Sequence, residues 1–192
     1  MSPLLSDQRR TLLDLARRAI VEAVRHGRLL QIPAYSGELS HCSGAFVSLH
    51  RRGHLRGCIG QIEAVDPLAE TVARCAVASA LEDPRFPPVR AEEIAELEIE
   101  ISVLSPLTRI TPEEIKVGTH GLLISCGAMR GLLLPQVATQ YHWDRERFLG
   151  ETCWKAGLER DAWKDPATRL EAFTAEVFSE ADFRTEDKAQ AS

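Results

Sequence analysis

The chain has 192 residues, of which 44% are hydrophobic and 27% are charged, as in a soluble protein with one sizeable core. Its formal net charge of −5 argues against broad binding to nucleic acid or anionic membranes, because both need a basic surface. The sequence contains no secretory leader pattern, no apolar run long enough to span a bilayer and no CxxC pair. We therefore expect a cytoplasmic protein with reduced thiols and no membrane segment.

The first predicted element is a helix that begins at Ser6 and ends at Gly27, because apolar residues recur at helical spacing between these two residues. A loop over residues 31–44 follows, rich in glycine, serine and proline. The loop leads into the segment that concentrates the reactive chemistry of the chain.

That segment predicts a β-hairpin with strands over residues 45–50 and 55–59. A three-residue loop, 51–53, would pair Leu49 with Leu55 and Phe46 with Cys58. Leu49 and Leu55 would then face one side of the hairpin, and Arg56 and Cys58 the other. A guanidinium this close to Cys58 would favour its thiolate over its thiol.

Glycines flank Cys58 at 57 and 60, as a strand requires where a ligand or another backbone approaches closely. A structural interpretation stays open for the same residues. Free cysteine is often an apolar core residue, and hairpin glycines often serve only the turn.

A helix is predicted from Asp66 to about Leu81, followed by a stiff loop over residues 82–88 with three prolines. The loop presents Arg85, either as a binding edge or as part of a rigid connector. Residues 97–106 alternate strictly between apolar and polar side chains and predict a strand. Glu100 on its polar face is a general base if that face also carries Cys58, and a solvated carboxylate otherwise.

In the second half of the chain, residues 122–126 and 132–135 predict a buried hairpin. His120 stands before its first strand, where either a catalytic or a structural role is open. Helices are predicted at 136–141 and 144–157, and one closing strand at 169–178. The composition becomes polar beyond Glu180, so we expect a disordered tail over residues 181–192.

Known cofactor motifs are absent from the sequence, including phosphate loops, dinucleotide fingerprints and the HExxH pattern. The six histidines form no recognisable zinc spacing. His50 and His54 would lie opposite each other in the predicted hairpin, but we predict no metal site, and the cofactor stays unknown.

Six stretches together resemble the AMMECR domain family, whose prokaryotic members are called AmmeMemoRadiSam system protein A. They are residues 55–60 (LRGCIG), 83–88 (DPRFPP), 100–106 (EISVLSP), 120–122 (HGL), 130–138 (RGLLLPQVA) and 153–158 (CWKAGL). The first is the hallmark of the family, and the six occur in the family's order.

The resemblance implies an α+β fold, with a largely antiparallel sheet flanked by helices in a single domain of two lobes over residues 1–180. The family's name implies that the chain works with a Memo-like protein and a radical S-adenosylmethionine enzyme. Carried over position by position, the motifs mark six candidate site residues: Arg56, Cys58, Arg85, Glu100, His120 and Arg130.

Two functional hypotheses follow. In the first, the chain is part of a modification system with a cleft in which Cys58 is nucleophile or covalent carrier. Glu100 or His120 would transfer protons, and Arg56, Arg85 and Arg130 would bind a substrate of unknown identity. In the second, the chain is a non-catalytic adaptor that uses the same motifs to dock a protein or, less in keeping with its acidic charge, a nucleic acid.

Overall fold

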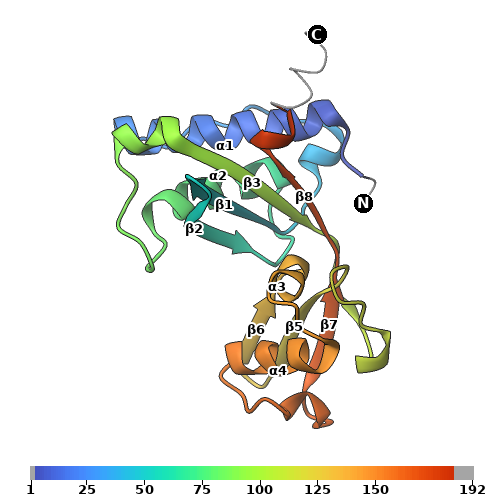
Figure 1. Cartoon of the computed structure of the whole chain (residues 1–192). Helices are drawn as coiled ribbons and strands as arrows, with labels where there is room; N and C mark the ends of the chain where they lie inside the picture. Colours follow the sequence, from blue (N-terminus) through green and yellow to red (C-terminus); the bar gives the residue numbers. More distant parts are fainter. Residues whose placement is uncertain (1–2, 184–192) are drawn as a thin grey trace, which may run out of the picture. The chain divides into compact units, whose positions relative to one another are not determined.

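The structure is a computed structural model that describes residues 3–183, and it divides into two compact units (Figure 1). The first unit contains the chain up to Leu104 together with the chain from Glu176 onward. The second unit contains Ser105–Ala175. Each unit has a four-stranded sheet and helices, and this arrangement confirms the α+β class with two lobes.

The sheet of the first unit has the strand order β2-β1-β3-β8. Its strands are β1 (Ala45–Arg51), β2 (His54–Gln61), β3 (Leu97–Leu104) and β8 (Ala175–Ser179), with β1 antiparallel to both β2 and β3. The helices are α1 (Ser6–His26) and α2 (Leu68–Leu81), with 3₁₀ turns η1 (Gly37–Ser40) and η2 (Ala91–Glu96).

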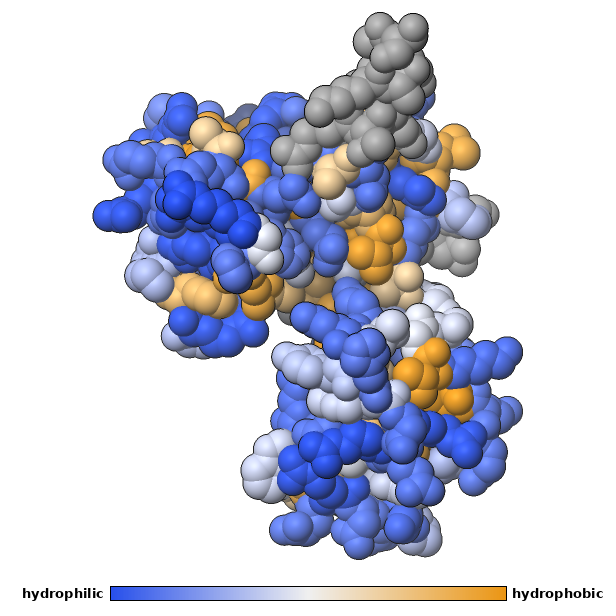
Figure 2. Space-filling model, viewed as in Figure 1, coloured by the Kyte–Doolittle hydropathy of each residue, from blue (hydrophilic) through white to orange (hydrophobic). Residues whose placement is uncertain are grey.

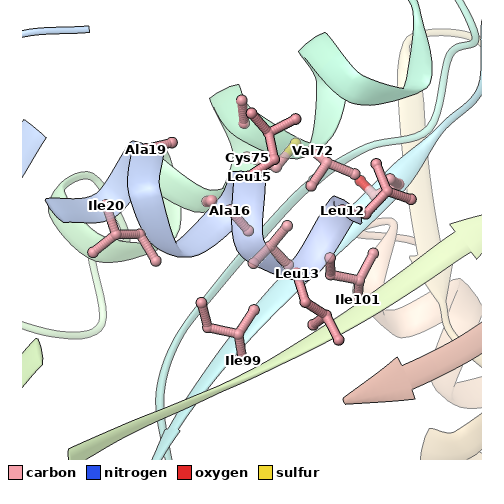
Figure 3. Close-up of a cluster of buried hydrophobic side chains, with 14 of the residues drawn as sticks. Leu12, Leu13, Leu15, Ala16, Ala19, Ile20, Val72, Cys75, Ile99 and Ile101 are labelled. Carbon is pink, nitrogen blue, oxygen red and sulfur yellow. Dashed lines mark hydrogen bonds between the residues drawn. The ribbon is translucent and has the colours of Figure 1, made fainter. Parts of the chain in front are cut away.

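The core of this unit lies between one face of its sheet and the two long helices (Figure 3). Leu12, Leu15 and Ile20 of α1 pack there with Val72 of α2 and with Ile99 of β3. Because side chains alternate along a strand, the opposite face of the same sheet carries the polar residues of β1 and β3. The sequence pattern of both strands predicts this division.

The second unit has the strand order β4-β7-β5-β6. Its strands are β4 (Thr108–Arg109), β5 (Gly121–Cys126), β6 (Met129–Leu133) and β7 (Arg169–Phe173). Its helices are α3 (Pro135–Gln140) and α4 (Arg145–Lys155), with η3 (Pro112–Glu114) and η4 (Ala162–Lys164). Phe148 and Leu149 of α4 are fully buried against Leu122 and Ile124 of β5.

A local signal sets the start of α4. The Asp144 side chain accepts a hydrogen bond from the Arg147 amide at 2.7 Å and caps α4, as predicted.

Outside the two cores, the face seen in Figure 2 is mostly hydrophilic, with small separate apolar patches on each unit. No helix within residues 3–183 combines the length and the apolar character needed to cross a lipid bilayer.

The prediction of one closing strand over residues 169–178 is wrong, because this stretch forms β7 and β8 in two different sheets. The strands separate at Thr174, whose N–H donates to Ser105 Oγ at 2.9 Å and whose carbonyl accepts from the Ser105 N–H at 2.9 Å. Alternation in a sequence indicates extended backbone but does not reveal that the backbone changes partners.

The predicted tail begins too early. Residues 180–183 form a helical turn, and Phe183 is only 8% exposed in the first core. The Arg10 guanidinium lies 4.4 Å from the centre of the Phe183 ring. The remainder of the predicted tail, 184–192, lies outside the described residues.

Candidate functional site

The hairpin that carries Cys58 closes with a two-residue turn, where the sequence predicted three residues. Arg51 pairs with His54, and the intervening Arg52 and Gly53 have φ of 52° and 79°. Positive φ at both central residues defines a type I′ turn, whose twist matches that of the two strands. His54 therefore lies opposite Arg51, and His50 lies opposite Leu55.

A β-bulge then shifts the register of β2 against β1 by one residue. Leu55 pairs with His50 and Gly57 pairs with Leu49, so Arg56 is the extra residue on its strand. The predicted pairs Leu49–Leu55 and Phe46–Cys58 are both wrong. Leu55, predicted to face the core, is 38% exposed.

Beyond the bulge, Cys58 pairs with Ser48 of β1, and Ser48 in turn pairs with Glu100 of β3. Residues directly opposite each other in antiparallel strands project to the same face, so the three side chains form one row. The Ser48 hydroxyl donates a hydrogen bond to Cys58 Sγ at 3.2 Å. Of the two alternatives for Glu100, the structure thus gives the one in which it shares a sheet face with Cys58.

The backbone of Cys58 is held by the proline-rich loop on the outer edge of β2. Its N–H donates to the Asp83 carboxylate at 2.8 Å, and its carbonyl accepts from the Arg85 guanidinium at 3.2 Å. Asp83 and Arg85 also form an ion pair at 2.7 Å. Side chains of this loop therefore bind both polar backbone groups of Cys58, on a strand edge that no other strand of the described residues covers.

Asp83 is buried, while the Arg85 side chain is 54% exposed. The hydrogen bond from Arg85 and the one from the Cys58 amide hold the pKa of the Asp83 carboxyl well below its usual range. The Asp83 carboxylate in turn raises the pKa of the Arg85 guanidinium. This ion pair is charged throughout the physiological pH range.

Arg56, by contrast, points to a different carboxylate. Its guanidinium donates from Nε and Nη2 to the buried Glu93, both at 3.0 Å, and from Nη1 to the Pro87 carbonyl at 2.9 Å. The side chain is only 13% exposed. Arg56 therefore fixes the proline-rich loop and η2 against the hairpin.

The two glycines of the motif are required by packing. A Cβ at Gly57 would lie 2.1 Å from the Ser79 carbonyl oxygen of α2. A Cβ at Gly60 would lie 2.2 Å from the ring of Phe46, its partner on β1. Gly57 is therefore required because the backbone of α2 approaches closely, which is one of the two roles that the sequence left open for the glycines. Gly60 leaves space for the ring of Phe46.

Glu100 is half-buried on the polar sheet face. Burial raises the pKa of its carboxyl, and the neighbouring His50 partly offsets that effect. Two strand spacings separate the Cα atoms of Cys58 and Glu100, or about 10 Å, with Ser48 between them.

The other cysteines provide a contrast with the half-buried Cys58. Cys75 lies in the core between α1 and α2 (Figure 3), and burial raises the pKa of its thiol to about 11. Burial also raises the pKa of the Cys153 thiol. Cys42 is exposed and Cys126 is half-buried, and all five cysteines are free of disulfides.

The remaining two candidates belong to the second unit. His120 is half-buried just before β5, and its Nδ1 accepts the Lys116 amide N–H at 3.3 Å. Arg130 lies on β6 opposite Ser125. In the first unit, Arg85 contacts the Cys58 carbonyl, Glu100 shares a row with Cys58, and Arg56 is on the same strand as Cys58.

Sequence reasoning missed Ser48 as the thiol's partner and Glu93 as the partner of Arg56. No motif identifies either residue: the bulge at Arg56 sets the pairing of Ser48 with Cys58, and Glu93 lies in a separate segment from Arg56. No group of three or more histidine, cysteine, aspartate or glutamate side chains in the described part of the chain could hold a metal ion.

Comparison with known proteins gives a consistent result. The AMMECR1 family model matches residues 13–178. A protein of Thermococcus gammatolerans is 48% identical over 181 residues, which cover 88% of each chain. A protein of Methanothermobacter thermautotrophicus is 44% identical over 187 residues, which cover 93% of this chain and 97% of the relative. The crystal structure of the uncharacterized protein PH0010 from Pyrococcus horikoshii matches with a TM-score of 0.84 and 46% identity, covering 88% of this chain and 90% of that one.

Proposed function

Because this chain belongs to the AMMECR1 family, we propose that it is a component of a modification system that includes a Memo-like protein and a radical S-adenosylmethionine enzyme. In this proposal Cys58 is the nucleophile or the covalent carrier. The observation that carries it is the fixed geometry of Cys58, whose N–H, carbonyl and thiol each have a partner from a different residue.

This geometry suits a nucleophile in three respects. The Asp83–Arg85 pair fixes the backbone, so the direction of Sγ is set before a substrate arrives. The Ser48 hydroxyl can donate to a thiolate. The thiol also remains partly accessible, in contrast to Cys75 and Cys153.

The charged neighbours have separate roles in the proposal. Arg85, with more than half of its side chain exposed, can bind an anionic group of the substrate next to the thiol. Glu100, in the same row of side chains, is the candidate for proton transfer, and its raised pKa suits that task. Arg56 supports the site by holding the proline-rich loop in place. The sequence had instead suggested that Arg56 contacts the substrate.

His120 and Arg130 stay candidates for proton transfer and substrate binding, respectively, on the second unit. A cytoplasmic location belongs to the proposal as well. It is supported by the five free cysteines, which a reducing compartment preserves.

Alkylation by iodoacetamide tests the nucleophile, with the modified peptides identified by mass spectrometry. We expect Cys58 to react before Cys42, although Cys42 is exposed and Cys58 is less accessible. The substitution Ser48→Ala should slow the alkylation of Cys58 but not that of Cys42. Because Cys42 lies outside the site, it serves as an internal reference for accessibility. Reaction of Cys58 at or below the rate of Cys42 would exclude an activated thiol.

A second function, a non-catalytic adaptor, is favoured by a specific observation. Arg56, Gly57 and Gly60 all have packing explanations, so much of the hairpin motif can be understood as a scaffold for the exposed proline-rich loop. On this hypothesis Cys58→Ser keeps partner binding and cellular function, whereas Arg85→Glu abolishes both. A Cys58→Ser variant that binds its partner but loses function would favour the thiol chemistry instead.

A further inference from the structure

A pocket of about 700 Å³ lies within the second unit, away from the thiol. Its walls come from the chain just before β4, from β4, from the segment between η3 and β5, and from the end of β7. His120 is in the lining, together with two basic residues that no motif had singled out, Arg109 and Lys116.

The basic groups of the pocket are available for a ligand. Within residues 3–183, neither the Arg109 guanidinium nor the Lys116 amine has a hydrogen-bond or ion-pair partner. Glu114 also lines the pocket, but its carboxylate accepts the Thr111 amide N–H at 2.8 Å, and this contact lowers the pKa of that carboxyl. The pocket thus holds two cations and one anion that is already hydrogen-bonded, a formal charge of +1.

His120 adds a directed donor. Because its Nδ1 accepts a backbone N–H from Lys116, the neutral ring must carry its proton on Nε2. The backbone N–H of His120 also donates to the Lys116 carbonyl at 2.9 Å, and this hydrogen bond fixes the backbone of the histidine. No group in the described part of the chain accepts from Nε2–H, which can therefore donate to an acceptor in the pocket.

The lining of the pocket also contains apolar residues. Phe173 is 2% exposed, and its ring lies against Gly121, where a Cβ would come within 2.3 Å of Cζ. Ile110 and Ala172 also line the pocket. A site with one apolar wall and a few convergent polar donors is typical of small-molecule binding.

We propose that this pocket binds a small organic carboxylate, with its carboxylate held by Arg109, Lys116 and His120 Nε2 and its apolar body against Phe173. The formal charge of +1 matches a monoanion better than a phosphate dianion. Guanidinium groups bind carboxylates through two parallel hydrogen bonds. The inference does not depend on the role of Cys58.

Amide chemical shifts of the whole 192-residue chain test this proposal, with benzoate as the probe and benzamide as its neutral counterpart. We expect saturable shifts at the amides of Thr108, Ile110, His120 and Thr174, with a Kd of about 10 mM or tighter for a ligand this small. Benzamide should bind at least about tenfold more weakly, because a charged hydrogen bond is lost.

Arg109→Gln should weaken the binding of benzoate about tenfold. Arg147→Gln on α4, which also removes an exposed guanidinium from the second unit but lies outside the pocket, should leave benzoate binding unchanged. Any of four results would overturn the proposal: no saturable shift, equal affinity for benzoate and benzamide, tighter binding of phenyl phosphate than of benzoate, or equal effects of the two arginine variants.

Discussion

Glu93 is the residue whose replacement most sharply tests how the site is held together. Its side chain is 6% exposed and accepts hydrogen bonds from Arg51, Arg56 and the Arg90 amide, all within 3.0 Å. These donors, Arg56 foremost, lower the pKa of the carboxyl from 4.5 to about 2. Glu93→Gln preserves the shape but removes the charge that all three contacts use.

The pKa gives the magnitude of the effect. A fall from 4.5 to about 2 corresponds to about 3 kcal/mol of folding free energy. Because Arg51 is 30% exposed, solvent screens part of this interaction. We therefore expect Glu93→Gln to lower the free energy of unfolding by about 2 kcal/mol near neutral pH.

The direction of the pH dependence follows from the lowered pKa. Between pH 4.5 and about 2, the unfolded chain binds a proton at Glu93 that the folded chain does not. The contribution to stability is thus complete above pH 4.5 and disappears as the pH falls toward about 2. The wild type and Glu93→Gln should converge in stability over this window.

Urea unfolding followed by far-UV circular dichroism at several pH values measures both effects. Glu96→Gln is the matched control, since Glu96 binds the same Arg51 from the same 3₁₀ turn but is 37% exposed. We expect that variant to differ little from the wild type. Equal stability of Glu93→Gln and the wild type at neutral pH, or a difference that persists in acid, would refute the reasoning.

Two further predictions concern packing around the site. Gly57→Ala should destabilise the fold by about 3 kcal/mol in urea unfolding, because the new Cβ would meet the Ser79 carbonyl at 2.1 Å; an unchanged midpoint would mean that α2 can move away at little cost. Phe183→Ala should cost about 3 kcal/mol by the same assay, since the ring is buried in the first core beneath Arg10; if stability is unaffected, the fold does not depend on the helical turn after β8.

The sequence by itself determined several of the elements and the sides they bury. Alternation over residues 97–104 gave β3 and its buried face, and the helical spacing of apolar residues gave α1. Capping by Asp144 and the prolines of the 82–88 loop set boundaries that the structure keeps. These features are local, so the residues that cause them are neighbours in the chain.

Tertiary structure alone decided what Cys58 touches. The turn type and the bulge at Arg56 set the pairing of Cys58 with Ser48, and the order β2-β1-β3 placed Glu100 in the same row. Which arginine meets which carboxylate was equally undetermined, since Arg56 binds Glu93 while Arg85 binds Asp83. Such pairings depend on how distant segments pack, and a shift in strand register changes them without changing the local pattern.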